Sequence, residues 1–311
     1  DISFPKTEKF EYLPSSPGQG PSAFVSIMEG CNKYCSFCVV PHTRGNEISR
    51  PLEDIINEAK DLASKGVVEI SLLGQNVNSY RDSKLKTKGL GLSNLIREIS
   101  LIQGIERISF TTSHPFEFGQ DLINIYEEVP ELISYVHLPV QSGSNEILKL
   151  MRRRHTREDY FEIIDKLRSA RPGISFSSDF IVGFPGETDK DFIATYNFIN
   201  SLDISYLHVF TYSERPNTDA IDIDQIVSRK TRIKRSKMLH ILSDKKNRYF
   251  HDQFIDQTRP VLFESIKNDH LVGHTDNYIE VRSNIEPELI NKIREVKLYK
   301  NCGKYVEGKI L

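Results

Sequence analysis

The sequence predicts an α/β protein whose larger part is a partial (β/α)6 barrel and whose C-terminal part is a small all-β barrel. Between residues 22 and 254, six strand-like runs alternate with segments whose apolar residues recur at helical spacing. This stretch holds roughly 230 residues, whereas a complete eightfold barrel takes about 250. After residue 255 the helical spacing stops, and short strand-like runs are separated by turn residues.

Each element of the predicted barrel has its own support in the sequence. The six strands are expected at 23–28, 67–73, 106–112, 134–140, 174–182 and 206–212. The helices are expected at 52–63, 92–102, 120–129, 144–151, 157–170, after Thr188, and as a long basic helix at 228–254. Thr156 with Asp159, and Thr188 with Asp191, have the spacing of a capping box at a helix start. Alternating strands and helices imply a parallel sheet, so a TIM-like partial barrel is favoured and a doubly wound open sheet is the alternative.

The chain divides into three predicted parts. Residues 1–21 are rich in proline and glycine and are expected to be a linker that follows a further N-terminal domain. Residues 22–254 form the barrel domain. Residues 255–311 carry four strand-like runs, at 259–264, 278–282, 294–299 and 305–310, and form the small β-barrel.

Composition limits the class of protein. The chain has 311 residues, 38% of them hydrophobic and 27% charged, with a net charge of −2. No run approaches the roughly 18 apolar residues of a membrane span, and the start of the chain lacks a secretory signal pattern. Three of the four cysteines fall within eight residues, which is unlike a disulfide scaffold. We therefore expect metal or redox chemistry in the cytoplasm and no membrane partner.

The cysteine motif directly follows the first predicted strand. Cys31, Cys35 and Cys38 are spaced C-x3-C-x2-C on one polar loop. Three thiolates on a short loop can each ligate one iron of a cubane and leave the fourth iron for an external ligand. Structural zinc would need a fourth ligand, for which His42 is the nearby candidate. A disulfide would leave one cysteine over.

The motif, with Phe37 before its last cysteine, resembles that of the radical S-adenosylmethionine (SAM) superfamily. The wider stretch 26–51 is similar to the methylthiotransferases of that superfamily that modify tRNA, and the resemblance extends over essentially the whole chain. It implies a [4Fe–4S] cluster on Cys31, Cys35 and Cys38, with SAM on the open iron. It also implies SAM cleavage to a 5′-deoxyadenosyl radical and a methylthio group added at C2 of N6-isopentenyladenosine next to the tRNA anticodon.

The loops after the six predicted strands carry the unusual polar and glycine-rich residues. Such loops share one face of a (β/α) barrel, where barrel enzymes place their chemistry. The resemblance implies that residues of these loops and of the inner strand faces contact SAM. The candidates are Gln75, Gln141, Ser142, Ser177, Asp179, Gly183 and Glu187. Asp179 is also the one candidate catalytic side chain, and the alternative for these residues is a hydrogen-bonded polar layer in the core.

Basic residues are concentrated in two places, at 228–250 and at 152–157, which favours a phosphate-binding surface. The alternative is a solvated helix face. The C-terminal β-barrel resembles a TRAM domain, an RNA-binding module, and this favours tRNA, through its anticodon stem-loop, over DNA as the partner. The candidate RNA-binding residues are Arg44 and Arg50 on the cysteine loop, with Arg229, Lys230, Arg232, Lys234 and Arg235.

Methylthiotransferases also carry an N-terminal domain with three further cysteines for a second [4Fe–4S] cluster, and these cysteines are not in this chain. We therefore expect the chain to bind SAM without completing methylthiolation. The resemblance further implies an electron donor such as flavodoxin or ferredoxin. Two alternatives are an enzyme that methylthiolates an aspartate of a ribosomal protein, and an RNA-binding protein with a purely structural metal.

Overall fold

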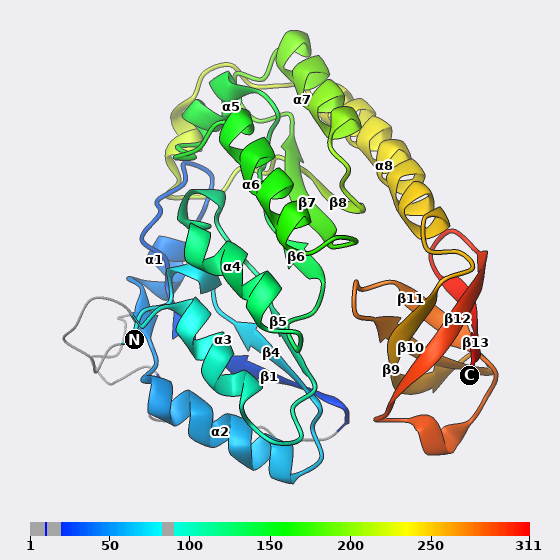
Figure 1. The fold of residues 1–311 in the computed structure, drawn as a ribbon. Helices are drawn as coiled ribbons and strands as arrows, with labels where there is room; N and C mark the ends of the chain where they lie inside the picture. Colours follow the sequence, from blue (N-terminus) through cyan, green and yellow to red (C-terminus); the bar gives the residue numbers. More distant parts are fainter. Residues whose placement is uncertain (1–9, 11–19, 83–89) are drawn as a thin grey trace.

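A computed structural model describes residue 10, residues 20–82 and residues 90–311. The predicted linker therefore lies almost entirely outside the described residues. Figure 1 shows a strand-and-helix domain from which one long helix leads to a small β-barrel.

Six parallel strands form the open barrel. The first sheet has the order β1 (Ser22–Ser26), β4 (Glu69–Leu73), β5 (Arg107–Phe110), and the second has the order β6 (Tyr135–His137), β7 (Ser175–Val182), β8 (Tyr206–Thr211). A single parallel bridge between Ile108 and Leu132 joins the two sheets. Strand order thus follows chain order without the reversal of a doubly wound sheet. The predicted partial barrel is confirmed.

Helices cover the outer face of this barrel (Figure 1). They are α2 (Leu52–Ser64), α3 (Leu92–Ser100), α4 (Gln120–Glu128), α5 (Asn145–Leu150), α6 (Arg157–Ala170), α7 (Asp189–Ser201) and α8 (Arg229–Asp252). Both predicted capping boxes, at Thr156 and Thr188, are formed. Apolar helix residues such as Ile55 and Leu95 pack on strand residues such as Val25 and Ile70 in one core. Among the described residues, no helix is both long and apolar enough to cross a bilayer.

The C-terminal part is a closed five-stranded barrel with the order β10 (His270–Thr275), β11 (Glu280–Ser283), β13 (Val306–Ile310), β12 (Ile293–Asn301), β9 (Thr258–Lys267). Four of these strands were predicted from the sequence, and β10 was not. Two histidines and a glycine in six residues give that strand a weak β pattern. Gly273 is needed there because a Cβ would lie 2.1 Å from the carbonyl oxygen of Leu262 on β9.

The two domains share a polar interface. Arg107 on β5 donates from its guanidinium to the carbonyl oxygens of His274 and Pro260, each at 2.8 Å. The ring of Tyr135 stacks on that of Tyr278, with centroids 4.6 Å apart. Arg107 and Tyr135 are the first residues of β5 and β6, so the small barrel contacts the open barrel at the amino ends of these strands.

Candidate cofactor site

The cysteine loop lies between the short strand β2 (Met28–Glu29) and helix α1 (Val40–Arg44), and β2 pairs with β3 (Ile48–Ser49). The Cys31 amide donates to the carbonyl oxygen of Gly45 at 3.1 Å, and the Cys38 amide to that of Cys35 at 3.0 Å. Gly30 has a φ of 82°, and a Cβ there would lie 2.1 Å from the carbonyl oxygen of Asn46. Only glycine fits this position, because its backbone is both left-handed and crowded.

Loops from several strands surround the cysteine loop. After β4, the Gln75 side chain accepts a hydrogen bond from the Gly30 amide at 2.7 Å. The Ser36 amide donates to the carbonyl oxygen of Met151 at 3.1 Å, after α5. Phe37 meets the ring of Phe184, after β7, edge to face. The cysteines therefore lie where the carboxyl ends of the barrel strands converge.

A polar network fixes the other side of the loop. Glu117, in the short helix Pro115–Glu117 after β5, pairs with Lys33 of the cysteine loop. It also accepts hydrogen bonds from Ser79 and, at 2.7 Å, from Asn76. Burial alone would raise the pKa of Glu117, but the donors Lys33, Ser79 and Asn76 bring it below its usual value. Glu117 thus stays ionised and holds Lys33 in place.

Two of the three thiols, those of Cys31 and Cys38, are poor acids in this environment. Burial raises the pKa of Cys31 to about 11, with smaller contributions from Glu47 and from the two other cysteines. Burial also raises the pKa of Cys38. Thiols bind metal only as thiolates, so iron has to displace their protons on binding.

The donor set fits an iron–sulfur cubane better than a zinc ion. Cys31, Cys35, Cys38 and Cys302 are all free thiols. His42, the candidate fourth zinc ligand, is exposed on α1. Within the described part of the chain, the one group whose potential ligand atoms all lie within 4.8 Å does not include these cysteines. A cubane separates its thiolates more widely than a single tetrahedral ion does, so three spaced thiols fit a [4Fe–4S] cluster with one iron free of protein ligands.

A model of the radical SAM superfamily matches residues 25–199, more than half of the chain. The chain belongs to the radical SAM superfamily. Its cofactors are accordingly a [4Fe–4S] cluster and SAM.

Curated relatives agree with this assignment. The chain is 45% identical over 314 residues to the tRNA-2-methylthio-N(6)-dimethylallyladenosine synthase of Photorhabdus laumondii. It is also 45% identical over 317 residues to the proteins of that name from Yersinia pseudotuberculosis and Yersinia pestis. Each match covers all of this chain and 66% of the relative, so the chain spans slightly under two thirds of those proteins.

Solved structures of radical SAM enzymes share the fold. The methyltransferase TsrM from Kitasatospora setae gives a TM-score of 0.54 at 20% identity, over 65% of this chain and 39% of that one. Coproporphyrinogen III oxidase from Escherichia coli gives 0.53 at 16% identity, over 91% of this chain and 68% of that one. At such identities the likeness concerns the fold alone.

The predicted SAM-binding residues fall into two groups. Gln141 has a left-handed backbone with a φ of 79°, and its buried side-chain oxygen has no hydrogen-bond partner among the residues that the structure describes. It is therefore available to a ligand. Three others already hold the site together. Gln75 bonds to Gly30, Ser142 contacts Thr195 at 3.2 Å, and Glu187 accepts from the Gly183 amide at 2.6 Å.

Glu187 is part of a buried ion pair. It pairs with Arg235 of α8, whose side chain also reaches Asp189 at 2.7 Å. Burial raises the pKa of Glu187, although the Gly183 amide and Arg235 oppose that shift. Gly183 has a φ of 72°, and a Cβ there would lie 2.3 Å from the Arg232 side chain. This pair therefore ties the glycine loop after β7 to α8.

The predicted RNA-binding residues also divide. Arg44, Arg229, Lys230 and Lys234 are exposed, although Arg44 approaches Glu29 at 3.4 Å. Arg50 is buried and pairs with Glu58 at 2.6 Å, and Arg232 pairs with Glu214 at 2.8 Å. Like Arg235, both are engaged in ion pairs within the protein, so only the exposed residues are candidates for RNA contact.

Arg153 was predicted only as part of a basic cluster. In the structure its Nη1 lies 3.5 Å from the sulfur of Cys35, and its Nη2 donates to the carbonyl oxygen of Pro139 at 2.7 Å. Nothing in a run of three arginines shows which one turns inward.

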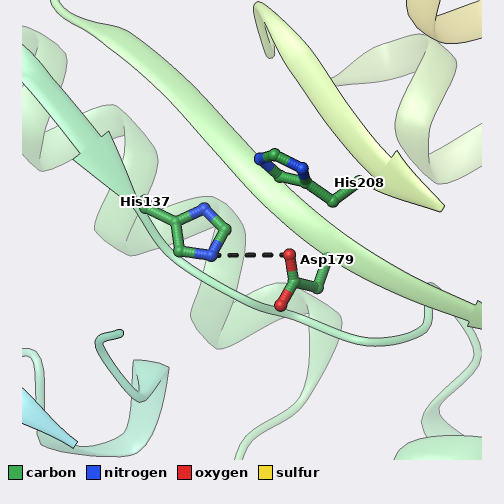
Figure 2. A group of neighbouring side chains, drawn as sticks. All are labelled: His137, Asp179 and His208. Carbon is green, nitrogen blue, oxygen red and sulfur yellow. Dashed lines mark ion pairs between the residues drawn. The ribbon is translucent and has the colours of Figure 1, made fainter. Parts of the chain in front are cut away.

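A second polar group lies on the inner face of the barrel. Figure 2 shows His137 of β6, Asp179 of β7 and His208 of β8 directed toward one another. His137 Nε2 is 3.4 Å from Asp179 Oδ1, and His137 Nδ1 is 2.7 Å from Ser177 Oγ. Burial, with His137 alongside, lowers the pKa of His208. The predicted SAM contacts Ser177 and Asp179 thus lie beside His208, a residue of the predicted strand 206–212 that was not among the predicted site residues.

Proposed function

We propose that the protein is the radical SAM core of a tRNA-2-methylthio-N6-dimethylallyladenosine synthase, which adds a methylthio group to C2 of N6-isopentenyladenosine next to the anticodon. The observation that carries this proposal is 45% identity along the whole chain to relatives of that name. The cysteine site supports it, because three thiols, with no compact fourth ligand beside them in residues 20–82 and 90–311, suit a cluster that binds SAM.

When bound, the cluster would supply one electron for the cleavage of SAM into methionine and a 5′-deoxyadenosyl radical. The chain's own residues position this chemistry. Gln75 and Gly30 hold the start of the cysteine loop, and Phe37 packs on the glycine-rich loop after β7. The unpaired oxygen of Gln141 is our first candidate for a direct SAM contact, since a buried acceptor without a donor is costly. Gly183 gives the backbone close approach at the same end of the barrel.

RNA is proposed to bind through exposed cations and the small barrel. Arg229, Lys230 and Lys234 are exposed at the start of α8, and Arg44 is exposed beside the cysteine loop. Positive side chains of this kind bind phosphates independently of sequence. The closed five-stranded barrel at the other end of α8 is the TRAM-like module and would extend this surface. The target is an anticodon stem-loop, whose unpaired bases can leave the stack.

Sulfur transfer is proposed to depend on a part outside this chain, with its second [4Fe–4S] cluster. We further propose a cytoplasmic protein served by a flavodoxin or ferredoxin. The chain should therefore cleave SAM but form no methylthio product with isopentenylated tRNA. A methylthionucleoside in the tRNA digest would show that this chain alone completes the sulfur transfer, and would contradict the proposal. Methylthiolation of a ribosomal protein instead of tRNA would contradict the proposed substrate.

The test of the first step compares two cysteines. After anaerobic reconstitution, the wild-type chain with dithionite and SAM should release 5′-deoxyadenosine, measured by chromatography. Cys35→Ala should lose at least 100-fold of this activity because a cluster ligand is removed, while Cys302→Ala in the small barrel should retain it. Equal activity of the two variants would refute the assignment of the cluster.

A further inference from the structure

The group formed by His137, Asp179 and His208 is the most compact set of metal-ligating side chains that the described residues contain. We propose that it binds one divalent first-row transition-metal ion, separate from the cluster on the cysteines. Three neighbouring strands contribute one ligand each, and all three side chains are half-buried on the inner face of the barrel (Figure 2). The proposal does not depend on the proposed function.

The spacing of the ligand atoms carries the argument. His137 Nε2 and Asp179 Oδ1 lie 3.4 Å apart, and the possible ligand atoms of all three residues lie within 4.8 Å of one another. A separation of 3.4 Å is long for a hydrogen bond between a ring nitrogen and a carboxylate. Two ligands on a tetrahedral ion with bonds of about 2.1 Å are separated by about 3.4 Å. The pair is thus placed as two ligands of one ion would be.

Neighbouring side chains orient the first ligand as a metal site requires. The Nδ1 of His137 meets the hydroxyl of Ser177 at 2.7 Å, and that hydroxyl meets the hydroxyl of Tyr135 at 2.6 Å. Metal-bound histidines commonly donate their second ring N–H to such a partner, which fixes the ring and directs the other nitrogen to the metal. Here the nitrogen left over is Nε2, the one that faces Asp179.

The register of the strands places the other two ligands side by side. Asp179 on β7 is directly paired with His208 on β8, and the strands are parallel, so both side chains point to the same face. The ring centroids of His137 and His208 are 5.3 Å apart, and the two ring planes are nearly perpendicular. Two imidazoles and one carboxylate suit zinc, iron(II) and cobalt(II) and leave coordination positions open to the barrel interior. Asp179 and Ser177 thereby receive roles other than direct contact with SAM.

The experiment measures zinc on the reconstituted holoenzyme, in which the cysteines are occupied by the cluster. After treatment with a chelator and equilibration with Zn²⁺, elemental analysis should find one zinc per wild-type chain. X-ray absorption at the zinc edge should show only nitrogen and oxygen neighbours at about 2.0–2.1 Å. Absence of stoichiometric zinc, or a sulfur neighbour, would overturn the proposal without reference to any variant.

Variants then locate the ion. His208→Gln and Asp179→Asn should weaken zinc binding at least tenfold by calorimetry, while His240→Gln, at an exposed histidine of α8, should bind like the wild type. The circular dichroism melt of each variant shows whether it is folded. Unchanged zinc affinity in folded His208→Gln and Asp179→Asn would refute the site. A second result would also refute the site: no zinc in the wild type together with weaker SAM binding by Asp179→Asn. Asp179 would then contact SAM and bind no metal.

Discussion

Arg153 lies beside one of the proposed cluster ligands without belonging to the proposed ligand set. Its guanidinium reaches the sulfur of Cys35 at 3.5 Å while a second donor holds it to Pro139. A cationic donor near a thiolate ligand favours the reduced, more negative state of a cluster. The sequence places Arg153 between two other arginines and gives no means of distinguishing it, because the distinction arises only from the fold of the loop after α5.

Replacing Arg153 with glutamine should make the cluster harder to reduce. The midpoint potential should fall on the order of 50 mV, since 59 mV corresponds to a tenfold change in a one-electron equilibrium. Redox titration followed by electron paramagnetic resonance measures the shift. The matched control is Arg152→Gln, because Arg152 is exposed and pairs with Asp219. Equal potentials in the two variants would show that the Arg153 contact does not act on the cluster.

At the scale of elements, the cysteine loop depends on a tight backbone turn at its start. Gly30 and Gly66 both have positive φ, 82° and 88°, but a Cβ would meet Asn46 at 2.1 Å only at Gly30 and would meet nothing within 4 Å at Gly66. Gly30→Ala should therefore displace the loop and prevent cluster assembly, whereas Gly66→Ala should cost about 1 kcal/mol and retain the cluster. Iron and sulfide content per chain measures the outcome. Full cluster content in Gly30→Ala would contradict this account of the loop.

Helix α8 separates structural cations from available ones. Its sequence is basic on all sides, so periodicity alone could not show that Arg235 is buried against Glu187 while Lys234 is exposed. Arg235→Gln should destabilise the protein by about 3–5 kcal/mol, because a buried carboxylate loses its partner. Urea denaturation measures this loss. Lys234→Gln should leave stability unchanged and should weaken binding of an anticodon stem-loop RNA, with a smaller salt dependence. Lower stability of Lys234→Gln, together with weaker RNA binding by a stable Arg235→Gln, would contradict this assignment of the two residues.

For the whole molecule, the sequence was informative about architecture and weak on contacts between distant parts. Alternating strands and helices predicted the open barrel, and the capping-box spacing predicted the starts of two of its helices. The domain interface was not predictable. Arg107 donates to backbone carbonyls, and every residue has one, so the amino-acid sequence does not indicate which carbonyls accept these bonds. The position of His208 beside His137 likewise depends on strand register across three separate strands.

The interface makes a prediction about cooperativity. Arg107→Met should leave two interface carbonyls without their donor and cost about 2–5 kcal/mol. The small barrel should then unfold at lower urea than the open barrel, giving two transitions by circular dichroism where the wild type gives one. Arg97→Met is the control, since Arg97 is partly exposed and pairs with Glu128 on a helix surface. A single unshifted transition in Arg107→Met would show that the domains are joined by other contacts.

The central claim is that three cysteines hold a cluster whose fourth iron accepts SAM. Electron–nuclear double resonance on the reduced, reconstituted chain with SAM labelled at its amino nitrogen and carboxylate oxygens tests it most directly. The account predicts hyperfine coupling from both labels to the cluster, and loss of the cluster in Cys31→Ala. A cluster that forms normally but shows no coupling to either label, or whose fourth iron carries a protein side chain, would contradict it.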